Sequence, residues 1–458
     1  MSRQPAQVPW RHRLRRGALT AISGLQPVRM RVERSTIAAR GPRVLAIASY
    51  TFPVYSHTFV YQELAQMLAA GFKVRLAFSA MSKDPIASQY RGVWRSRRRL
   101  VVDDRSADRA VARYEERMPS RVNELVQVLS EASGMDESMI RKDRHFRQAF
   151  TFTRLVESYR PDYLHSYFFY EGSLFALVAS FLLQIPRGMT CYADHMLDDY
   201  HLKVVALHMR QCDLVVATSH RIKQELTGFM PEAASKILVK PNGVNTARFP
   251  AQERLASKPD ELPSVVSVSR LDPKKGLLEL VEAAGLLRDR DQAVRLCIIG
   301  AADPAPSSRN YAEALQARVK ELGLDDLVHL VGRKSESQIN DYFRRSDVFV
   351  APYVETPTGD KDGIPTALLE AMSAGLAIVA TDAGSIREVI EDGVDGVIVG
   401  QGDSIGLANA IAFLVGDADA RREMGLRAAR KARATLEASV IGRELHERMR
   451  AVSNGSPR

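Results

Sequence analysis

The segment TGDKDGIPTALLEAMSAGLAIVATDAGSIREVIE, residues 358–391, combines a glycine-containing loop, a helix and a buried strand in one short stretch. Gly359 and Gly363 allow the loop to approach other backbone closely. Pro365 suits the first turn of a helix, so we predict that the helix begins there or one residue later. The apolar run at 378–381 is typical of a buried strand. A loop, a helix and a buried strand in this order form the repeating unit of a parallel α/β sheet.

The same alternation continues on both sides of this segment and predicts one sheet in each half of the chain. In the second half, the predicted strands are 265–269, 296–300, 328–331, 348–351, 378–381 and 397–399, and the predicted helices are 276–289, 310–322, 336–345, 366–374, 385–391, 405–416, 419–434 and 437–452. In the first half, the predicted strands are 44–50, 74–78, 163–166, 189–192, 214–218 and 237–239, and the predicted helices are 58–70, 146–159, 174–183 and 219–226. We therefore expect an α/β protein with two Rossmann-like, doubly wound domains that face each other across a cleft.

The expected domain boundaries follow from breaks in this alternation. Residues 43–245 form the first Rossmann-like domain, with a more polar, helical insertion at about 82–145. The stretch 246–263 contains three prolines among polar residues and is interpreted as a linker. Residues 264–435 form the second domain, and residues 436–458 form a C-terminal helix that we expect to pack back on the first domain. Ligands of such proteins bind at the carboxyl ends of the strands, so the cleft is the expected site.

Length and composition exclude several classes of protein. A chain of 458 residues with 45% hydrophobic and 26% charged residues is typical of a globular protein with two or three domains. The longest apolar stretch, 174–185, is shorter than the roughly 20 residues of a membrane-spanning helix. The three cysteines are widely spaced, which predicts neither a disulfide framework nor a zinc site and fits a reducing cytosol. A disordered chain, a collagen and a polytopic membrane protein are excluded.

Residues 1–42 form a basic tail that we expect to be disordered. Residues 1–43 hold ten arginines and one acidic residue, Glu33, and account for nearly all of the net charge of +10. The tail lacks the continuous apolar core of a signal peptide, so we do not expect secretion. Three interpretations stay open, namely a solvated tail, nucleic-acid binding, and attraction to an anionic membrane surface at roughly 1 kcal/mol per basic residue. No zinc-finger spacing or RNP-type motif supports nucleic acid, which we do not expect as a partner.

Two carboxylates flank the start of the helix predicted near Pro365. The free N–H groups at a helix start offer an anion site that suits phosphate. Asp362 precedes this N-terminus, and Glu370 follows eight residues later, about one turn inside the helix. Carboxylates at such positions can hold a sugar hydroxyl and a ribose diol. Taken alone, the pair also fits an N-cap and a solvated glutamate. The surrounding glycines and the strand behind the helix favour the binding site.

This segment resembles the Glu-x7-Glu signature, roughly E-G-x-P-x-x-x-x-E-A-M-A-x-G-x-P-V-V-A-T, of the family 4 retaining, nucleotide-sugar-dependent glycosyltransferases with the GT-B fold. The resemblance covers most of residues 44–450 and is strongest across 264–400. Asp362 stands at the first glutamate, where its carboxylate reaches about one methylene less far, and Ala377 replaces the usual proline. The resemblance implies that Asp362 orients the sugar and that a further set of residues binds the nucleotide sugar. At this segment the set is Glu370, for the ribose, with Gly363, Ile364 and Thr366.

Residues 267–276, SVSRLDPKKG, resemble the family pattern of a strand ending in Gly-Arg-Leu and followed by a Lys just before a Gly. The resemblance implies that Arg270 and Lys275 bind the donor diphosphate and stabilise the leaving group, with Ser269 in place of the usual glycine. A guanidinium fork and a compact ammonium group suit one dianion. Taken alone, the two cations also fit a solvated turn. In relatives, the backbone of a strand and glycine turn contacts the base. Arg333 lies in the segment that resembles this turn, so its main chain is a further candidate.

The N-terminal half normally carries the acceptor site in this family. Residues 49–59, SYTFPVYSHTF, resemble the F-P-x-x-S-E-T-F loop of exopolysaccharide-type members such as colanic acid and amylovoran transferases. His57 stands where a glutamate is usual. Through Ser56 and Thr58, this loop would border the acceptor and the phosphates, and a purely structural role stays open.

The sequence departs from the family near residue 190. Relatives have Thr-x-His-x-x-Asp there, and this His touches the donor sugar, whereas residues 190–195 read TCYADH. Either His195 serves after a local bulge, or Tyr192 and Asp194 line the pocket instead. His165 resembles a histidine at a strand end in the family and is a further candidate, although a lone histidine is more often structural.

The resemblance implies a retaining glycosyltransferase that moves a sugar from a UDP- or GDP-sugar to a polysaccharide, glycolipid or lipid-linked acceptor in exopolysaccharide or cell-envelope glycan synthesis. The catalytic residues would be Asp362, Arg270, Lys275 and His195. No DxD motif is needed, so we expect neither a metal nor another cofactor. We expect a cytoplasmic protein, with peripheral attachment to the inner membrane face through residues 1–43. The alternatives are a nucleotide-sugar epimerase of the same fold and a non-catalytic nucleotide-sugar-binding protein. A phosphorylase would need a pyridoxal-binding lysine motif, which is absent.

Overall fold

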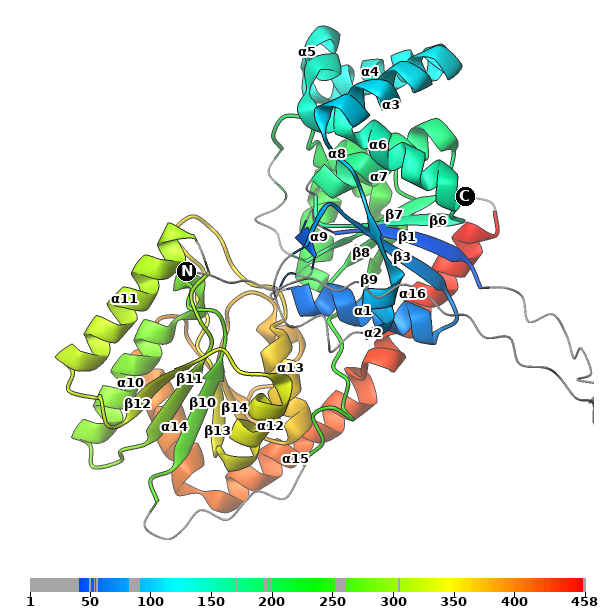
Figure 1. Cartoon of the computed structure of the whole chain (residues 1–458). Coiled ribbons are helices and arrows are strands. Elements are labelled where there is room, and N and C mark those ends of the chain that lie inside the picture. The colour runs from blue at the N-terminus through cyan, green and yellow to red at the C-terminus, as the bar shows by residue number, and fades with distance from the viewer. Residues whose placement is uncertain are drawn as a thin grey trace, which may run out of the picture. The chain divides into compact units, whose positions relative to one another are not determined.

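Two parallel sheets, one in each half of the chain, carry the fold of the computed structural model (Figure 1). The structure describes residues 41–48, 51–52, 54, 57–81, 91–169, 171–192, 197, 199–251, 261–303 and 305–455. The chain from Gly41 onward forms one compact unit. Residues 1–40 of the predicted tail lie outside the described residues.

The first sheet has seven parallel strands in the order β5-β3-β1-β6-β7-β8-β9. Its strands are β1 (Arg43–Ile47), β3 (Lys73–Phe78), β5 (Arg97–Arg99), β6 (Tyr163–Tyr167), β7 (Arg187–Cys191), β8 (Leu214–Ala217) and β9 (Ile237–Val239). A small pair is formed by β2 (Thr51–Phe52) and β4 (Ala80–Met81). The helices of this half are α1 (Thr58–Ala69), α2 (Arg91–Ser96), α3 (Asp104–Arg117), α4 (Pro119–Ser133), α5 (Glu137–Lys142), α6 (Arg144–Tyr159), α7 (Glu171–Leu183), α8 (Val205–Arg210), α9 (His220–Phe229) and the 3-10 turn η4 (Pro231–Lys236).

The second sheet has six parallel strands in the order β12-β11-β10-β13-β14-β15. Its strands are β10 (Ser264–Val268), β11 (Arg295–Ile299), β12 (Val328–Gly332), β13 (Val348–Ala351), β14 (Ala377–Thr381) and β15 (Val397–Val399). The helices are α10 (Leu277–Asp289), α11 (Pro306–Glu321), α12 (Glu336–Arg345), α13 (Thr366–Ala374), α14 (Ser404–Gly416), α15 (Ala418–Thr435), α16 (Ala438–Ser453) and the 3-10 turns η5 (Pro273–Lys275) and η6 (Ile386–Glu388).

Both sheets have the doubly wound order predicted from the sequence. The chain adds strands outward in one direction and then returns to the middle, so the order reverses between β1 and β6 and again between β10 and β13. Doubly wound sheets bind ligands at this reversal, outside the carboxyl ends of the strands. The topology therefore points to one end of each sheet as the place to look for a site.

Alternating side chains along each strand explain why helices cover both faces of the second sheet. Val265 of β10 packs into the core with Leu280 of α10, whereas the next residue, Val266, packs into a second core with Leu368 of α13. Successive residues of a strand point to opposite faces, and both faces here are apolar. Buried parallel strands of this kind read as the continuous apolar runs seen in the sequence.

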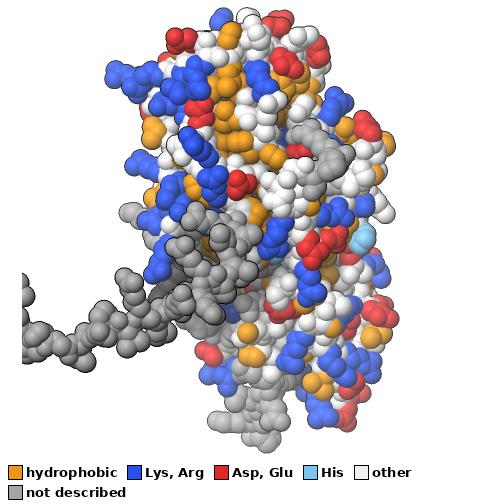
Figure 2. All heavy atoms as spheres, turned by 90° about the vertical axis from the view of Figure 1, so that its right-hand side faces the viewer, with side chains coloured by type: hydrophobic (Ala, Val, Ile, Leu, Met, Phe, Trp, Pro, Cys, Tyr) orange, Lys and Arg blue, Asp and Glu red, His pale blue; other side chains and the backbone are white. Residues whose placement is uncertain are grey.

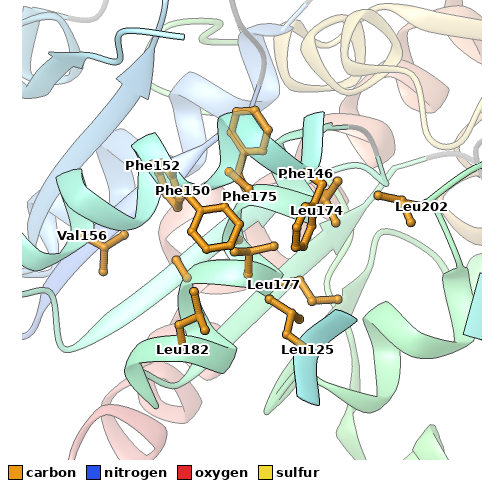
Figure 3. Packing of buried hydrophobic residues seen from close by; sticks show 14 of the residues in the cluster. Leu125, Phe146, Phe150, Phe152, Val156, Leu174, Phe175, Leu177, Leu182 and Leu202 are labelled. Atoms are coloured by element: carbon orange, nitrogen blue, oxygen red, sulfur yellow. The ribbon is translucent and has the colours of Figure 1, made fainter. Parts of the chain in front are cut away.

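The region predicted as an insertion, 82–145, is more closely joined to the first domain than expected. Its strand β5 pairs with β3 and extends the main sheet. Its helices α3, α4 and α5 pack against α6 and α7. Figure 3 shows the resulting core, where Phe146 and Phe150 of α6 lie near Phe175 of α7. The rings of Phe146 and Phe150 meet edge to face with their centroids 5.2 Å apart.

The C-terminal helix α16 packs on the first half of the chain. Its Leu445 and Met449 belong to the core that contains β1 and α1. Two backbone segments run together where the chain passes between the halves, because Val244 N donates to Leu436 O at 2.9 Å and Ala438 N donates to Val244 O at 2.9 Å. The last helix thus fastens the second half of the chain to the first.

One helix prediction is wrong. Residues 385–391 form only the short 3-10 turn η6. The segment has the spacing of a helix, because Ile386, Val389 and Ile390 are all buried. It is confined between two glycines with positive φ, Gly384 and Gly393, and so short a helix is not stable on its own.

The surface of the folded part mixes charges of both signs. Figure 2 shows Lys and Arg side chains next to Asp and Glu side chains on one face. Such mixing fits the nearly neutral charge that remains once residues 1–43 are set aside. Within the described residues, no helix is long and apolar enough to cross a membrane, and no three His, Cys, Asp or Glu side chains are grouped to hold a metal ion.

Candidate functional site

A cavity of about 510 Å³ lies where loops from both sheets meet. In the first half it is lined by the start of α1, Phe168 after β6, Tyr192 after β7 and residues 242–245 after β9. In the second half it is lined by the loops that follow β10, β11, β12 and β13 and by the start of α13. These segments follow the carboxyl ends of strands, which is where doubly wound proteins bind ligands. Its position makes this cavity the candidate site.

Nine of the residues singled out from the sequence line this cavity, among them Thr58 and Tyr192 from the first half of the chain. The other seven come from the second half. They are Arg270, Lys275, Asp362, Gly363, Ile364, Thr366 and Glu370. The two cations lie on the connection from β10 to α10, and the other five lie on the loop before α13 or in this helix. The fold therefore brings the predicted cations, both predicted carboxylates and a helix start into one space.

Two other candidate residues, His165 and Arg333, are described by the structure and are absent from the cavity lining. His165 is fully buried in β6, where its Nε2 lies 2.9 Å from Thr190 Oγ1 and 3.5 Å from Glu63 Oε1. Arg333 is absent from the lining, although the next residue, Lys334, is part of it. Ser56 and His195 lie outside the described residues. Asp194, offered as an alternative to His195, lies outside them too.

Carboxylates hold the cations of the cavity in place. Arg270 forms an ion pair with Asp303 and lies 3.7 Å from the carboxylate of Asp272. Lys275 forms an ion pair with Asp362, and its Nζ also lies 4.2 Å from the ring centroid of Tyr353. These contacts fix the direction in which each positive group points before any anion binds.

A second lysine strengthens the same cluster. Lys274 Nζ lies 3.1 Å from Asp360 Oδ1 and 3.6 Å from Asp362 Oδ1. Burial alone would raise the pKa of Asp362, but the ammonium groups of Lys275 and Lys274 outweigh it and hold this pKa below its ordinary value. Asp362 is therefore ionised at neutral pH and bridges the two lysines.

The loop that carries Asp362 is anchored to the first half of the chain. Arg221 Nη2 donates to Asp362 O at 3.3 Å, and Asn242 Nδ2 donates to Ile364 O at 3.2 Å. A Cβ atom on Gly363 would lie 3.0 Å from Tyr192 O, so the backbone passes close to the opposite wall. Helix α13 then begins at Thr366 without a side-chain cap, which leaves its first N–H groups at the cavity.

Glu370, in helix α13, has an unusually high pKa. Burial and the nearby carboxylate of Glu336 raise the pKa of Glu370 to about 8. The positive charge of Arg248 has a smaller effect in the opposite direction. Arg248 is already engaged by Glu336, with Nη2 lying 2.6 Å from Oε2. No hydrogen bond from the described residues reaches the Glu370 carboxyl group, which is left for a ligand.

Aromatic rings form the opposite wall. The rings of Phe59 and Tyr192 have their centroids 4.1 Å apart, and the Phe168 ring lies 5.4 Å from that of Tyr192. Tyr192 offers the cavity its ring and not its hydroxyl, since this oxygen is buried without a hydrogen-bond partner. Tyr192 is thus part of an apolar surface.

Sequence reasoning missed several residues of the site. Lys274 had a signal in the adjacent pair Lys-Lys before Gly276, and Asn242 had one in its turn position. Asp303 and Glu336 had no such signal. Asp303 pairs with Arg270, and Glu336 lies near Glu370, only when separate strands are joined in one sheet.

Comparison with known proteins identifies both halves of the chain. Residues 56–248 match the family described as Glycosyltransferase Family 4, and residues 250–431 match the family described as Glycosyl transferases group 1. The putative colanic acid biosynthesis glycosyltransferase WcaL of Escherichia coli is 32% identical over 219 residues, which are 47% of this chain and 52% of WcaL. The amylovoran biosynthesis glycosyltransferase AmsK of Erwinia amylovora is 31% identical over 234 residues, 51% of this chain and 55% of AmsK. The chain thus spans about half the length of these curated relatives.

Solved structures share the fold across most of the chain. HepE of Anabaena, crystallised in complex with UDP, superimposes with a TM-score of 0.67 at 16% identity and covers 89% of this chain and 99% of its own. Sucrose-phosphate synthase of Thermosynechococcus elongatus superimposes with a TM-score of 0.66 at 17% identity, over 91% of this chain and 100% of its own. The first half of the chain is therefore a Glycosyltransferase Family 4 domain and the second half a group 1 glycosyltransferase domain, and the chain has the GT-B fold.

Proposed function

We propose that the protein is a retaining glycosyltransferase that moves a sugar from a UDP- or GDP-sugar to a glycan or lipid-linked acceptor. The observation that carries this proposal is the meeting of Arg270, Lys275, Asp362 and Glu370 with the start of α13 in one cavity. HepE, which has the same fold, was crystallised with UDP and with UDP-glucose. WcaL and AmsK are named for colanic acid and amylovoran biosynthesis, which favours an exopolysaccharide acceptor.

In the proposed complex, the diphosphate lies between Arg270, Lys275 and the N-terminus of α13. A guanidinium, an ammonium and free backbone N–H groups would stabilise the negative charge that grows on the leaving diphosphate. Asp362 would orient the sugar, and Glu370 would accept hydrogen bonds from the ribose hydroxyls.

The proposed reaction proceeds on one face of the sugar. The bond from the anomeric carbon to the diphosphate oxygen breaks, and a bond to the acceptor oxygen forms on the same side. The acceptor proton passes to the departing diphosphate. No second carboxylate is needed as a covalent nucleophile, as a double displacement would require. The proposal includes no metal or other cofactor.

Thermal unfolding with nucleotides tests the donor site. A ligand at 100 times its dissociation constant stabilises a protein by about 2.7 kcal/mol, so the matching nucleotide among UDP, GDP and ADP should raise the unfolding temperature. Arg270→Ala should abolish the shift, whereas Arg427→Ala, on the exposed side of α15, should keep it. A folded protein that responds to no nucleotide or nucleotide sugar would contradict the proposal.

Product analysis separates the enzyme classes. A glycosyltransferase consumes the nucleotide sugar faster when an acceptor is present and releases the nucleoside diphosphate. An epimerase would return an altered nucleotide sugar without an acceptor, and a binding protein would bind without turnover. Either result would replace the transferase assignment.

We also propose a cytoplasmic location with peripheral attachment to the inner membrane face through the arginine-rich residues 1–43. Removing residues 1–40 should reduce binding to anionic liposomes, and more so at low salt, because exposed charges are screened by salt. Unchanged liposome binding would contradict this attachment.

A further inference from the structure

His57 lies immediately before helix α1 and lines the cavity from the first half of the chain, whereas Asp362 and Glu370 line it from the second half. It is half-buried, and its two ring nitrogens are in different environments. Nδ1 is buried and has no hydrogen-bond partner among the described residues. Nε2 has no partner there either and is not buried, so it is the ring nitrogen that a bound molecule can reach.

The surroundings of His57 keep its ring in place and uncharged. Its ring centroid lies 5.1 Å from that of Phe168 and 5.9 Å from that of Phe59. Burial, with a further contribution from the positive charge of Arg270, lowers the pKa of His57 to about 4. The imidazole is therefore neutral at physiological pH, and it lies near enough to Arg270 to sense its charge.

We propose that His57 is a sugar-binding residue, whose Nε2 exchanges a hydrogen bond with a hydroxyl group of the sugar attached to the diphosphate. This inference rests on the proposed function, which places the diphosphate at Arg270. The sugar is bonded directly to this diphosphate and must therefore lie close to the same arginine. His57 lines the same cavity from the first half of the chain and is near enough to Arg270 to sense its charge.

The chemistry of the wall favours a sugar over an anion at this point. A neutral imidazole adds no positive charge for a phosphate, but it can donate or accept one hydrogen bond. It stands among the rings of Phe59, Phe168 and Tyr192, and Tyr192 contributes no hydroxyl to the cavity. One polar atom within an aromatic surface matches a sugar, which has apolar C–H faces and a rim of hydroxyl groups.

Binding of the nucleoside diphosphate and of its sugar conjugate should be compared in three variants. His57→Phe keeps an aromatic ring and removes both nitrogens, whereas His57→Gln restores a hydrogen-bonding group. His145→Phe, on α6 outside the cavity, is the matched control for replacing a histidine by phenylalanine. Calorimetry gives the dissociation constants, and thermal unfolding shows whether each variant is folded.

We expect His57→Phe to weaken binding of the nucleotide sugar by about threefold to tenfold, the range of one neutral hydrogen bond. Binding of the nucleoside diphosphate alone should stay within about twofold of the unaltered protein. His57→Gln should recover part of the loss, and His145→Phe should lose nothing.

Three results would overturn the inference. In the first, His57→Phe binds the nucleotide sugar as tightly as the unaltered protein does. In the second, His57→Phe loses as much affinity for the nucleoside diphosphate as for the nucleotide sugar. The loss could also be confined to the Michaelis constant of the acceptor, which would place His57 at the acceptor. If the unaltered protein binds neither ligand, the proposed function itself fails, and the inference fails with it.

Discussion

If the nucleotide sugar binds as proposed, Glu370 should make its affinity depend on pH in a predictable direction. The pKa of its carboxyl group is about 8, because the group is partly removed from water and lies near Glu336. The hydroxyl groups of a ribose are hydrogen-bond donors and prefer the ionised carboxylate. Binding should therefore release a proton, and affinity should increase as the pH rises through the pKa of the unliganded protein.

The size of the effect follows from this pKa. Glu370 is about 3% ionised at pH 6.5 and about 75% ionised at pH 8.5. If only the ionised form accepts the ribose, affinity rises about 25-fold over this interval, which corresponds to about 1.9 kcal/mol. An ordinary exposed glutamate, fully ionised throughout this interval, would give no change.

Calorimetry with the nucleotide sugar between pH 6.5 and 8.5 measures this dependence. The nucleotide sugar is preferred to the free diphosphate, whose terminal phosphate titrates near pH 6. Glu370→Gln cannot ionise and should bind with the same affinity at every pH in this interval. Titrations in two buffers of different ionisation enthalpy should detect nearly one proton released at pH 6.5, and none in the variant. Equal pH profiles for the two proteins would refute the reasoning.

Three further changes test other parts of the site and its support. Glu336→Gln removes a like charge and should lower the pKa of Glu370, so the same titration should have its midpoint at lower pH; an unmoved midpoint would count against the interpretation. Glu63→Ala leaves a buried ammonium group unpaired and should lower the free energy of unfolding in urea by about 3–5 kcal/mol, and a loss below about 1 kcal/mol would contradict a buried ion pair. Gly384→Ala would place a Cβ atom 2.0 Å from the carbonyl oxygen of Asp362 and should weaken nucleotide-sugar binding about tenfold or more. Gly416→Ala, where a Cβ atom meets nothing within 4 Å, should bind normally.

The fold could be predicted because it depends on local patterns. Each strand predicted from an apolar run has a counterpart in the structure, and helix α13 spans Thr366–Ala374, as predicted. Periodicity was misleading where a neighbouring segment decides the outcome. The stretch 385–391 has helical spacing, but glycines with positive φ at both ends limit it to one 3-10 turn.

The site could be predicted only in part, for a different physical reason. Asp362 and Glu370 are recognisable because their loop, helix and strand are continuous in the chain. The environment of His165 could not be recognised in the same way. Beside it lies a buried ion pair between Glu63 and Lys240, and these two residues are 177 positions apart in the sequence. A sequence reveals which side chains can bind a ligand, but burial decides whether a ligand reaches them.

The ion pairs of the cavity also explain how it could hold a diphosphate and still release it. Arg270 is paired with Asp303, and Lys275 is paired with Asp362, so neither cation is surrounded by water alone. A diphosphate that binds there would share or replace these carboxylates instead of meeting unpaired charges. Much of its attraction would be offset by the pairs that it weakens, because breaking such a pair leaves a charge partly uncompensated. The carboxylates return to the cations when the diphosphate leaves, which would favour release of the product after transfer.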